Sequence, residues 1–177
     1  GVLGREYKSI NPKATYIGVE LMPEPASKAR AVLDYVIEGN ISDKEISLPA
    51  ELQDVDCIIF GDVLEHLINP EQTLKKILPL LKREGVLLIC IPNAQHWSMI
   101  ANLLQGQWPQ EEMGLFDKTH LRWFTKKTIG NMLNALNMHI QEIHPRIFKP
   151  EIAQDFIAKL HPSLENLGLN PQTVLEG

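Results

Sequence analysis

The sequence predicts an α/β protein with a doubly wound, mostly parallel sheet. Three observations lead to this prediction. Short β-rich runs alternate with stretches whose apolar residues have helical spacing, as in chains built from right-handed strand-helix-strand units. The run from Val86 to Ile91 is almost continuously apolar, which is typical of a parallel strand covered on both faces. The 177 residues, of which 44% are hydrophobic, can bury one good core, so a single domain is favoured.

The first part of the chain predicts two short strands, each preceded by a helix. The first strand is β-rich and ends in the acid Glu20, and Pro12 and Lys13 form the turn before it. The second helix has an alanine-rich pattern. Helices are expected at residues 2–9 and 23–33, strands at 14–20 and 35–39, and a loop at 39–49.

The middle of the chain predicts a buried strand, a helix and a second buried strand. Val55 to Gly61 forms the first strand, and a polar turn leads from it to a helix that opens at Asn69. Pro70 takes the first helical position, where its fixed φ suits a helix start. Gly85 is expected to stop this helix, and Pro92 ends the following strand. One apolar face is expected from Leu74, Ile77, Leu78 and Leu81.

The alternation breaks after this second buried strand. Residues 94–124 contain a short helical pattern, a Gly-Gln-Trp-Pro turn and an acidic pair, so we expect an insertion or lid over the strand ends. Thr125 caps a helix that runs to about Leu136, and Met138 to Ile143 alternates like an exposed or edge strand. Residues 151–168 return to helical spacing. The expected domains are a core at 1–149, with the lid at 94–124, and a helical extension with a tail at 150–177.

Composition narrows the classes of partner and location. The 17 basic and 22 acidic residues give a formal charge of -5 without a dense Lys/Arg block, so long nucleic acid is not expected as a partner. No apolar run approaches the roughly 20 residues that cross a bilayer, so we expect no membrane partner. Cys57 and Cys90 fall within predicted strands, where they are expected to be buried and unlinked. A cytoplasmic location is the expectation.

Polar residues gather where the two buried strands end. Asp62, Glu65 and His66 follow the first strand, and Asn93 follows the second. In an open parallel sheet the carboxyl ends of the strands form the crevice that binds ligands. These four residues are therefore the first candidates for a site.

Four segments, taken together and in order, resemble the class I S-adenosylmethionine-dependent methyltransferases. They are Gly18 to Glu20, Asp62 to His66, Gly85 to Asn93, and Phe116 to Thr125. The resemblance runs from residue 1 to about Ile143. The last segment is similar to a signature of bacterial methyltransferase domains associated with glycosyltransferases and with small-metabolite modification. The resemblance implies a Rossmann-like methyltransferase sheet, S-adenosylmethionine as cofactor, and an enzyme.

One departure from the family concerns its first strand. Members begin with a strand and a glycine-rich turn, whereas Gly1 to Gly4 resembles only the tail of that turn. In the family this strand lies at the centre of the sheet, and its turn brings N–H groups against the methionine end of the cofactor. We therefore expect a chain truncated within the glycine motif, in which another segment fills the gap or the sheet closes differently.

The resemblance also implies which residues bind the cofactor. Glu20 ends a strand roughly 20 residues beyond the glycine turn, where a carboxylate accepts hydrogen bonds from ribose hydroxyls. An alternative is that Glu20 is a solvated strand-end acid, that Gly4 packs a helix, and that Asp62 caps the following turn. The implied cofactor-binding residues are Gly1 and Gly4 at the turn, Glu20 at the ribose with Leu21 next to it in the chain, Asn40 and Ile41 beside the adenine, and Asp62 and Val63 beside the methionine part.

A metal site is a further hypothesis for the same turn. Asp62, Glu65 and His66 fall at i, i+3 and i+4, on one face if the turn is helical, and His120 completes the set. The spacing resembles the Glu-x-x-Glu-His plus distant His site of metal-assisted O-methyltransferases. A divalent ion there would hold an acceptor hydroxyl and lower its pKa. The alternative is that the Glu-His pair shapes a pocket without metal, while His120 orients the loop that contains Arg122.

Without a metal, an imidazole is the expected general base. His66 and His120, with Glu65 beside them, are the candidate catalytic residues, because imidazole titrates near neutral pH. His96 is a third candidate, with a surface role as its alternative. S-adenosylmethionine carries an activated methyl group, so alignment supplies much of the acceleration and a strong base is optional.

Aromatic and basic residues of the predicted lid have two interpretations each. Trp97, Trp108, Trp123 and Phe124 form pocket walls, or they pack against one another as a private core. Arg122 binds an anionic acceptor such as a nucleotide-sugar phosphate, or it forms a salt bridge with Asp117.

The function favoured by these residues is methyl transfer from S-adenosylmethionine to a small molecule, with a hydroxyl as the expected acceptor. The acceptor is expected to be a sugar or nucleotide-sugar, and an oligomer is expected if it compensates for the missing strand. One rival is a methyltransferase-like binding fragment without catalysis. Another is a nicotinamide-dependent Rossmann enzyme, which accounts for Glu20 but not for the segments 62–66 and 119–125.

Overall fold

The computed structural model describes residues 1–43, 46, 48–49, 52–146 and 149–171. The chain forms two compact units, and each is described by itself. Unit 1 comprises Gly1–Asp56 and Gln72–Gly85, and unit 2 comprises Cys57–Glu71 and Val86–Gly177. Three positions of the predicted 39–49 loop and the predicted tail after residue 171 lie outside the described residues. The predicted domain boundary at residue 149 stays a prediction.

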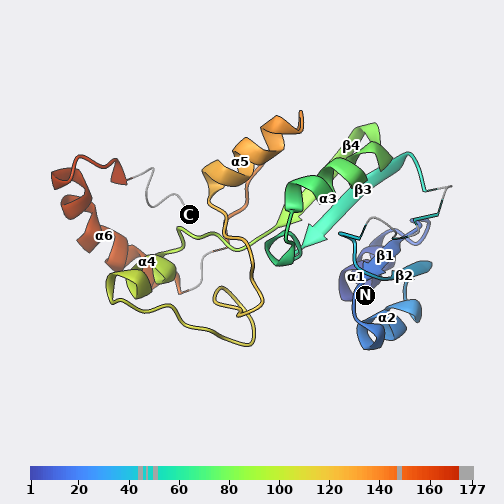
Figure 1. Ribbon diagram of the computed structural model, residues 1–177, viewed down its shortest axis with the longest axis horizontal. Coiled ribbons are helices and arrows are strands. Elements are labelled where there is room, and N and C mark those ends of the chain that lie inside the picture. The colour runs from blue at the N-terminus through green and yellow to red at the C-terminus, as the bar shows by residue number, and fades with distance from the viewer. Residues whose placement is uncertain (44–45, 47, 50–51, 147–148, 172–177) are drawn as a thin grey trace. The chain divides into compact units, whose positions relative to one another are not determined.

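Unit 1 contains a parallel two-stranded sheet, β1 (Ile17–Glu20) and β2 (Tyr35–Glu38), in which Glu20 lies opposite Glu38. Helix α2 (Pro23–Arg30) connects the two strands and packs against both of them (Figure 1). Helix α1 (Val2–Ile10) precedes them. These four elements confirm the helices and strands predicted for this part of the sequence.

Gly4 is buried inside unit 1, where helix α1 meets two side chains of the same unit. A Cβ atom at Gly4 would lie 2.3 Å from Leu33 Cδ2 and 3.0 Å from the ring of Tyr16. A side chain at this position would force the Leu33 methyl group to shift. The contact supports the alternative in which Gly4 packs a helix.

A second two-stranded sheet consists of β3 (Val55–Gly61) and β4 (Leu81–Cys90), whose arrows point the same way in Figure 1. Helix α3 (Pro70–Ile77) lies between them in the chain, followed by a short 3-10 turn at Leu78–Leu80. Pro70 begins the helix as predicted. The mixed α/β fold with parallel strands confirms the predicted fold class, while the expectation of a missing first strand stays a prediction.

The predicted end of helix α3 is wrong. The sequence predicts a stop at Gly85, but the helix ends at Ile77 and β4 already begins at Leu81. Pro79 explains the difference, because proline has no N–H for a helical hydrogen bond and its ring clashes with the preceding turn. Gly85 therefore lies within β4 rather than at a helix terminus.

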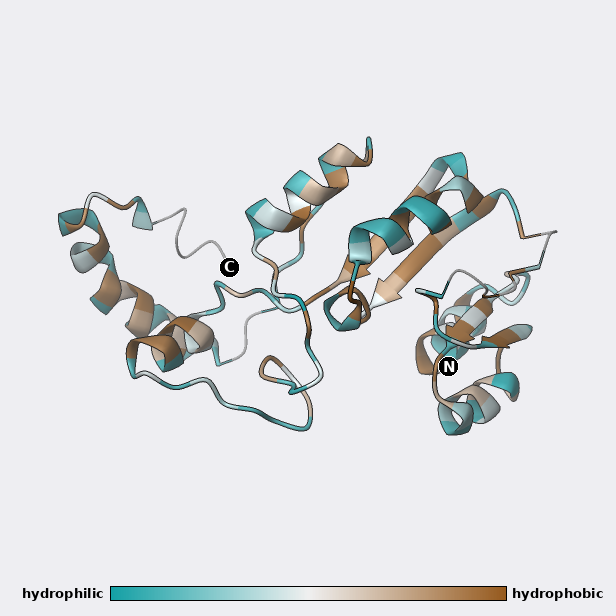
Figure 2. Cartoon of the chain, in the orientation of Figure 1, coloured by the Kyte–Doolittle hydropathy of each residue, from teal (hydrophilic) through white to brown (hydrophobic). Residues whose placement is uncertain are grey.

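One face of the β3–β4 sheet is open to solvent in unit 2, although the sequence predicted cover on both faces. Val86 and Leu88 of β4 are 46% and 50% exposed, and Ile59 of β3 is also exposed. Cys57 and Cys90 are exposed as well and form no disulfide, so their predicted burial is wrong. The apolar residues lie mainly in the carboxyl halves of both strands (Figure 2), but exposure alternates there, so only one face is covered.

Three helices belong to the rest of unit 2. They are α4 (Trp97–Leu104), α5 (Lys126–Ala135) and α6 (Pro150–Asn166). Thr125 caps α5 as predicted, because its hydroxyl accepts from Thr128 N while the Thr128 hydroxyl accepts from Thr125 N. Helices α4 and α6 contact each other, with the rings of Trp97 and Phe156 6.2 Å apart.

The predicted strand at Met138–Ile143 is wrong. These residues follow α5 without joining either of the described sheets, and both Ile140 and Ile143 are exposed. Alternation of apolar residues predicts a strand only if another strand pairs with it. The described residues place no partner strand beside this segment.

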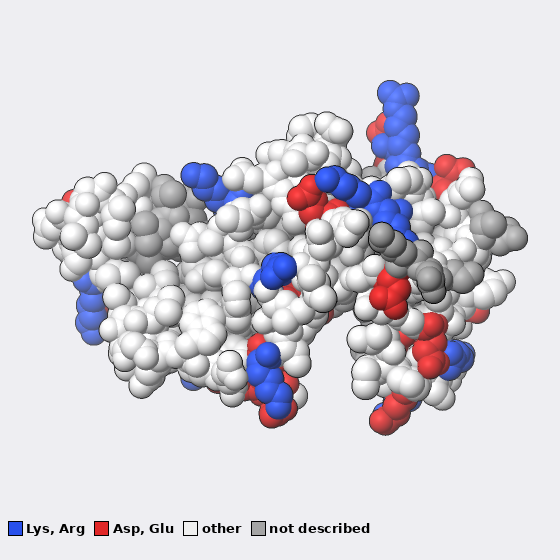
Figure 3. Space-filling view, in the orientation of Figure 1, with Lys and Arg blue, Asp and Glu red and all other residues white. Residues whose placement is uncertain are grey.

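Basic and acidic side chains are interspersed on the face that Figure 3 shows, without a continuous basic stripe. None of the helices that the structure describes is long and apolar enough to cross a membrane.

Candidate active site

A short 3-10 turn, Leu64–His66, follows β3 and carries the central residues of the site. Leu64 is fully buried and anchors the turn. The main-chain carbonyl of Glu65 accepts two hydrogen bonds, from Leu121 N at 2.8 Å and from Arg122 N at 3.0 Å. These bonds hold the segment 117–122 against the turn, although the two are more than fifty residues apart in sequence.

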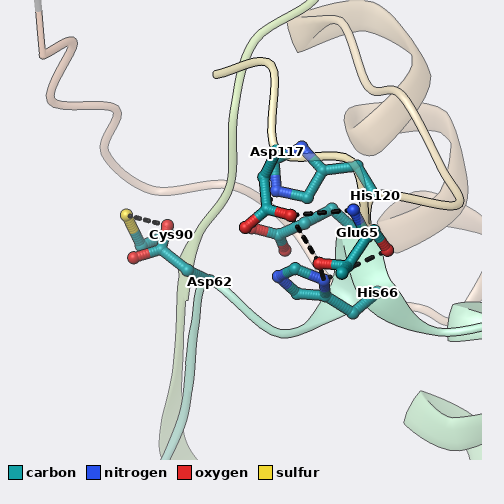
Figure 4. A network of polar contacts seen from close by, with 7 residues as sticks. Asp62, Glu65, His66, Cys90, Asp117 and His120 are labelled. Carbon is teal, nitrogen blue, oxygen red and sulfur yellow. Dashed lines mark hydrogen bonds and ion pairs between the residues drawn. The ribbon is translucent and has the colours of Figure 1, made fainter. Parts of the chain in front are cut away.

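This attachment brings two histidines and one carboxylate together (Figure 4). His120 Nε2 lies 4.0 Å from Glu65 Oε1, and the ring centroids of His66 and His120 are 4.8 Å apart with an edge-on contact. The three residues offer ligand atoms that all lie within 4.8 Å of one another. The structure thus groups Glu65, His66 and His120, and their catalytic roles stay predictions.

Burial shapes the electrostatics of this cluster. Glu65 is only 1% exposed, and neither of its carboxylate oxygens has a hydrogen-bond partner among the described residues. Burial therefore raises the pKa of Glu65, because the charged form loses its hydration. Burial also lowers the pKa of His120, and the neighbouring His66 lowers it further. Both shifts favour the neutral forms, which weakens the 4.0 Å contact as an ion pair.

His66 is held by a different set of contacts. Its Nδ1 atom lies 3.0 Å from Thr119 Oγ1 and 3.3 Å from the Thr119 main-chain oxygen. Thr119 donates in turn to Asp117 Oδ1, from its hydroxyl at 2.6 Å and from its main-chain N at 2.8 Å. The two hydrogen bonds from Thr119 lower the pKa of Asp117, since they stabilise its charged form.

Asp62 lies outside the cluster. Its backbone has a left-handed φ of 52°, so it does not continue the turn that contains Glu65. Its N–H donates to the Cys90 carbonyl at 3.0 Å, and its Oδ1 accepts from Cys90 Sγ at 3.3 Å (Figure 4). Partial desolvation raises the pKa of the Cys90 thiol, and the hydrogen bond to Asp62 adds to the effect. The predicted four-residue metal set is therefore reduced to three residues.

The two predicted alternatives for Asp62 and Arg122 also need correction. Asp62 makes no capping hydrogen bond to the turn, whose N-cap residue is Val63. Arg122 donates to the main-chain oxygens of Ile68 and Leu121 and forms no salt bridge with Asp117. The guanidinium thus ties its own loop to the segment after the turn, and a free anion-binding role is not supported.

The predicted ribose and adenine residues lie together in unit 1. Glu20 and Leu21 follow β1, while Asn40 and Ile41 follow β2, at the same carboxyl end of the parallel sheet. Glu20 Oε1 accepts from Met22 N at 3.1 Å, and its Oε2 has no partner among the described residues. Asn40 Oδ1 accepts from Ser42 N at 2.9 Å. Gly1 is exposed at the start of α1.

The aromatic residues mainly pack against one another. The rings of Trp108 and Trp123 are 4.8 Å apart and those of Trp108 and Phe116 are 5.6 Å apart, both edge to face. Trp123 also contacts the His120 ring at 5.3 Å. The private-core alternative therefore describes this cluster, although Trp108 remains 42% exposed.

Three further predicted residues have structural contacts. Phe124 is buried and pairs with Asn93 in an isolated bridge, and its carbonyl accepts from Ala94 N at 2.7 Å. Trp97 contacts the buried His96, whose Nδ1 caps helix α4 through Ser98 N. Burial lowers the pKa of His96. The predicted surface role of His96 is thus replaced by a capping role.

The sequence did not predict the contacts of Asp117 and Thr119 with His66, since Asp117 was expected only as a possible partner of Arg122. Both lie within the segment Phe116 to Thr125 that carried the resemblance, and their Asp-x-Thr spacing is typical of a side chain that bonds the backbone two residues on. That signal predicts a local turn. It does not predict that Thr119 contacts His66, because the contact depends on the two hydrogen bonds to Glu65.

Parallel strands joined by helices, with acidic and imidazole groups after their carboxyl ends, define an α/β domain of the ligand-binding type. The chain belongs to the family of methyltransferase domains, whose pattern matches residues 2–143. This match confirms the predicted family. The glycosyltransferase-associated subtype stays a prediction.

A solved structure supports the fold. The chain is similar to a candidate methyltransferase from Bacillus halodurans, with 18% sequence identity and a TM-score of 0.57. The match covers 80% of this chain and 62% of that protein's chain, so it extends over less than two thirds of the relative. No curated protein gave a significant match to the chain.

Proposed function

We propose that this protein transfers a methyl group from S-adenosylmethionine to a hydroxyl of a small molecule, with a sugar or nucleotide-sugar as the acceptor. The observation that carries the proposal is the cluster of Glu65, His66 and His120 after β3, in a chain that belongs to the methyltransferase domains. Imidazoles next to a strand end suit proton transfer from a hydroxyl. A cytoplasmic location belongs to the same proposal.

The residues of unit 1 fit the ribose and adenine part of the cofactor. Glu20 keeps Oε2 available after its bond to Met22, and Asn40 lies at the same end of the sheet. A carboxylate in this position accepts hydrogen bonds from two ribose hydroxyls. Bound S-adenosylmethionine would supply an activated methyl group on a sulfonium, so the protein needs chiefly to align the acceptor and remove its proton.

His66 is the general base of the proposal. Its Nδ1 is engaged by Thr119, which leaves the other ring nitrogen for the acceptor hydroxyl. His120 lies beside it, and burial lowers the pKa of its imidazole, which favours the neutral form. Glu65 is buried next to His120.

A divalent ion is the second candidate for this cluster. The donor set of two imidazoles and one carboxylate suits a transition metal such as zinc, manganese or cobalt. The two carboxylate oxygens of Glu65 have no partner among the described residues, which is the feature that fits a cation. A bound ion would lower the pKa of an acceptor hydroxyl.

Replacing Glu20 by alanine tests the cofactor site. Loss of hydrogen bonds from ribose to a charged group should weaken S-adenosylmethionine binding by about 10- to 100-fold, measured by titration calorimetry. The fold should persist, because Glu20 makes one contact of its own, to Met22 N. Glu24→Ala is the matched control, since Glu24 is an exposed acid paired with Lys28 on helix α2. Unchanged affinity in Glu20→Ala would remove the ribose assignment.

Metal removal tests the second candidate. If the cluster holds an ion, the metal-free chain should bind one Mn²⁺, Co²⁺ or Zn²⁺ in calorimetry, and chelation should abolish methyl transfer. His120→Ala should weaken binding by more than the roughly 10- to 100-fold that loss of an outer partner costs. His161→Ala on helix α6 is the control, because His161 is exposed and distant in sequence. Full activity in a metal-free preparation would rule out a role for an ion in methyl transfer.

A non-catalytic binding fragment is the rival proposal. It predicts that S-adenosylmethionine does not bind, so the same calorimetry separates the two. Methyl transfer is then measured with S-adenosylmethionine labelled in its methyl group and a panel of hydroxyl-bearing sugars and nucleotide-sugars. Binding without transfer to any hydroxyl, but with transfer to an amine, would correct the acceptor class.

A further inference from the structure

Four hydrogen bonds join Asp117, Thr119 and His66, and the chemistry of their donors and acceptors fixes their directions. Asp117 is a carboxylate at neutral pH and only accepts hydrogen bonds. The Thr119 hydroxyl has one proton, and the 2.6 Å contact with Asp117 Oδ1 takes it. The Thr119 oxygen is thus left to accept from His66 Nδ1, at 3.0 Å. The dashed lines in Figure 4 connect Asp117 to His66 through these hydrogen bonds of Thr119.

A second acceptor at the same nitrogen leads to the same conclusion. The main-chain oxygen of Thr119 lies 3.3 Å from His66 Nδ1, and a carbonyl oxygen only accepts. Both neighbours of Nδ1 therefore require a proton on it. A neutral imidazole carries one N–H, so the lone pair lies on Nε2.

We infer that Asp117 and Thr119 are positioning residues, which fix His66 in the form with its proton on Nδ1 and its lone pair on Nε2. The inference deepens the proposed function, on whose assignment of His66 as the base it rests. Nε2 is then the atom that accepts the proton of the acceptor hydroxyl. If an ion occupies the cluster, the same lone pair binds it, and the Nδ1–H to Thr119 is the outer bond that orients the ligand.

The main-chain contacts of the loop make this arrangement rigid. Asp117 Oδ1 also accepts from Thr119 N, and the Asp117 carbonyl accepts from His120 N at 3.1 Å. The next two amides, of Leu121 and Arg122, donate to the carbonyl of Glu65, which adjoins His66. Thr119 is thus fixed on both sides, so its hydroxyl and carbonyl meet His66 at a set distance and angle.

The experiment reads the protonated nitrogen of His66 directly. The chain labelled uniformly with ¹⁵N is studied by long-range ¹H–¹⁵N correlation at about pH 8, above the ordinary histidine pKa of about 6.5. Its spectrum contains six histidines, and His66 is assigned from the signals lost in His66→Gln. We expect the N–H signature at Nδ1 and the lone-pair signature at Nε2. The reverse pattern in the unmodified chain would overturn the inference.

Variants then test which residue sets the pattern. Asp117→Asn introduces N–H donors, which free the Thr119 hydroxyl to donate to His66, so the Nε2–H form should gain population. Thr119→Ser keeps the hydroxyl and should retain the wild-type spectrum, as should Thr15→Val, which removes an exposed hydroxyl elsewhere. An Asp117→Asn spectrum identical to wild type would overturn the role of Asp117.

Turnover adds a second measurement. Asp117→Asn should lower kcat by about 10- to 100-fold with little change in KM, the size expected when an orienting partner is lost. A rise in KM alone, with kcat unchanged, would contradict a positioning role. The spectra need no turnover, so an absence of methyl transfer would count against the proposed function and a reversed tautomer against this inference.

Discussion

His66→Gln is expected to slow methyl transfer to the acceptor hydroxyl by about 10²- to 10⁴-fold, the usual contribution of a positioned general base. Glutamine keeps hydrogen-bonding groups beside Thr119 but cannot take a proton from the acceptor. The binding of S-adenosylmethionine should stay within twofold of wild type, because the proposed ribose contacts belong to Glu20. The measurement is kcat and KM for an acceptor found in the methyl-transfer screen, together with calorimetry.

The control for this prediction is His139→Gln. His139 is exposed after helix α5 and belongs to no described cluster around the site. It should leave kcat unchanged. If His66→Gln retains wild-type kcat, alignment of the acceptor supplies the acceleration and the general-base role of His66 is withdrawn.

Glu65→Gln is expected to change how stability depends on pH. Burial raises the pKa of Glu65, so over the range above its ordinary value of 4.5 the folded chain binds more protons than the unfolded chain. The contribution of the Glu65 carboxyl to the free energy of unfolding is fully present below pH 4.5 and is lost as pH rises through the raised pKa. One proton gives a slope of at most about 1.4 kcal/mol per pH unit. Glutamine has no such proton, so the variant should gain stability relative to wild type as pH rises.

The free energy of unfolding is measured by urea denaturation from about pH 4 to pH 8 in metal-free buffer. The difference between Glu65→Gln and wild type should grow with pH and then level off. Glu84→Gln removes an exposed carboxylate of β4 and should give a flat difference. A flat difference for Glu65→Gln as well would show that its carboxyl keeps an ordinary pKa in the folded chain.

Local signals in the sequence predicted the elements whose ends depend on one residue. Pro70 marks the start of α3, and Thr125 caps α5, because both act within a single helical turn. The end of α3 differs from the prediction because Pro79 stops the helix early, whereas the sequence predicts a stop at Gly85, since glycine often follows the last residue of a helix. Apolar alternation predicted a strand at 138–143, but pairing is a property of two segments and not of one.

The sequence predicted only the part of the site that depends on neighbouring residues. Glu65 and His66 are adjacent in sequence, so their proximity follows from the chain, and the link to His120 followed only from the resemblance. Asp62 was assigned to the same face on the assumption of a helical turn, which its left-handed φ breaks. Thr119 was missed because its contact with His66 spans 53 residues and depends on main-chain bonds that no side-chain pattern records.

The two amides that donate to the carbonyl of Glu65 have a consequence for how the site opens. Segment 117–122 contains no helix, yet it shares its hydrogen bonds with the turn after β3. Each such bond contributes about 0.5–1.5 kcal/mol net, so the loop and the turn are expected to unfold locally as one cooperative element. Amide hydrogen exchange at Leu121 and Arg122 should thus report the same opening event as the amide of His66, which donates to Val63 O at 3.0 Å.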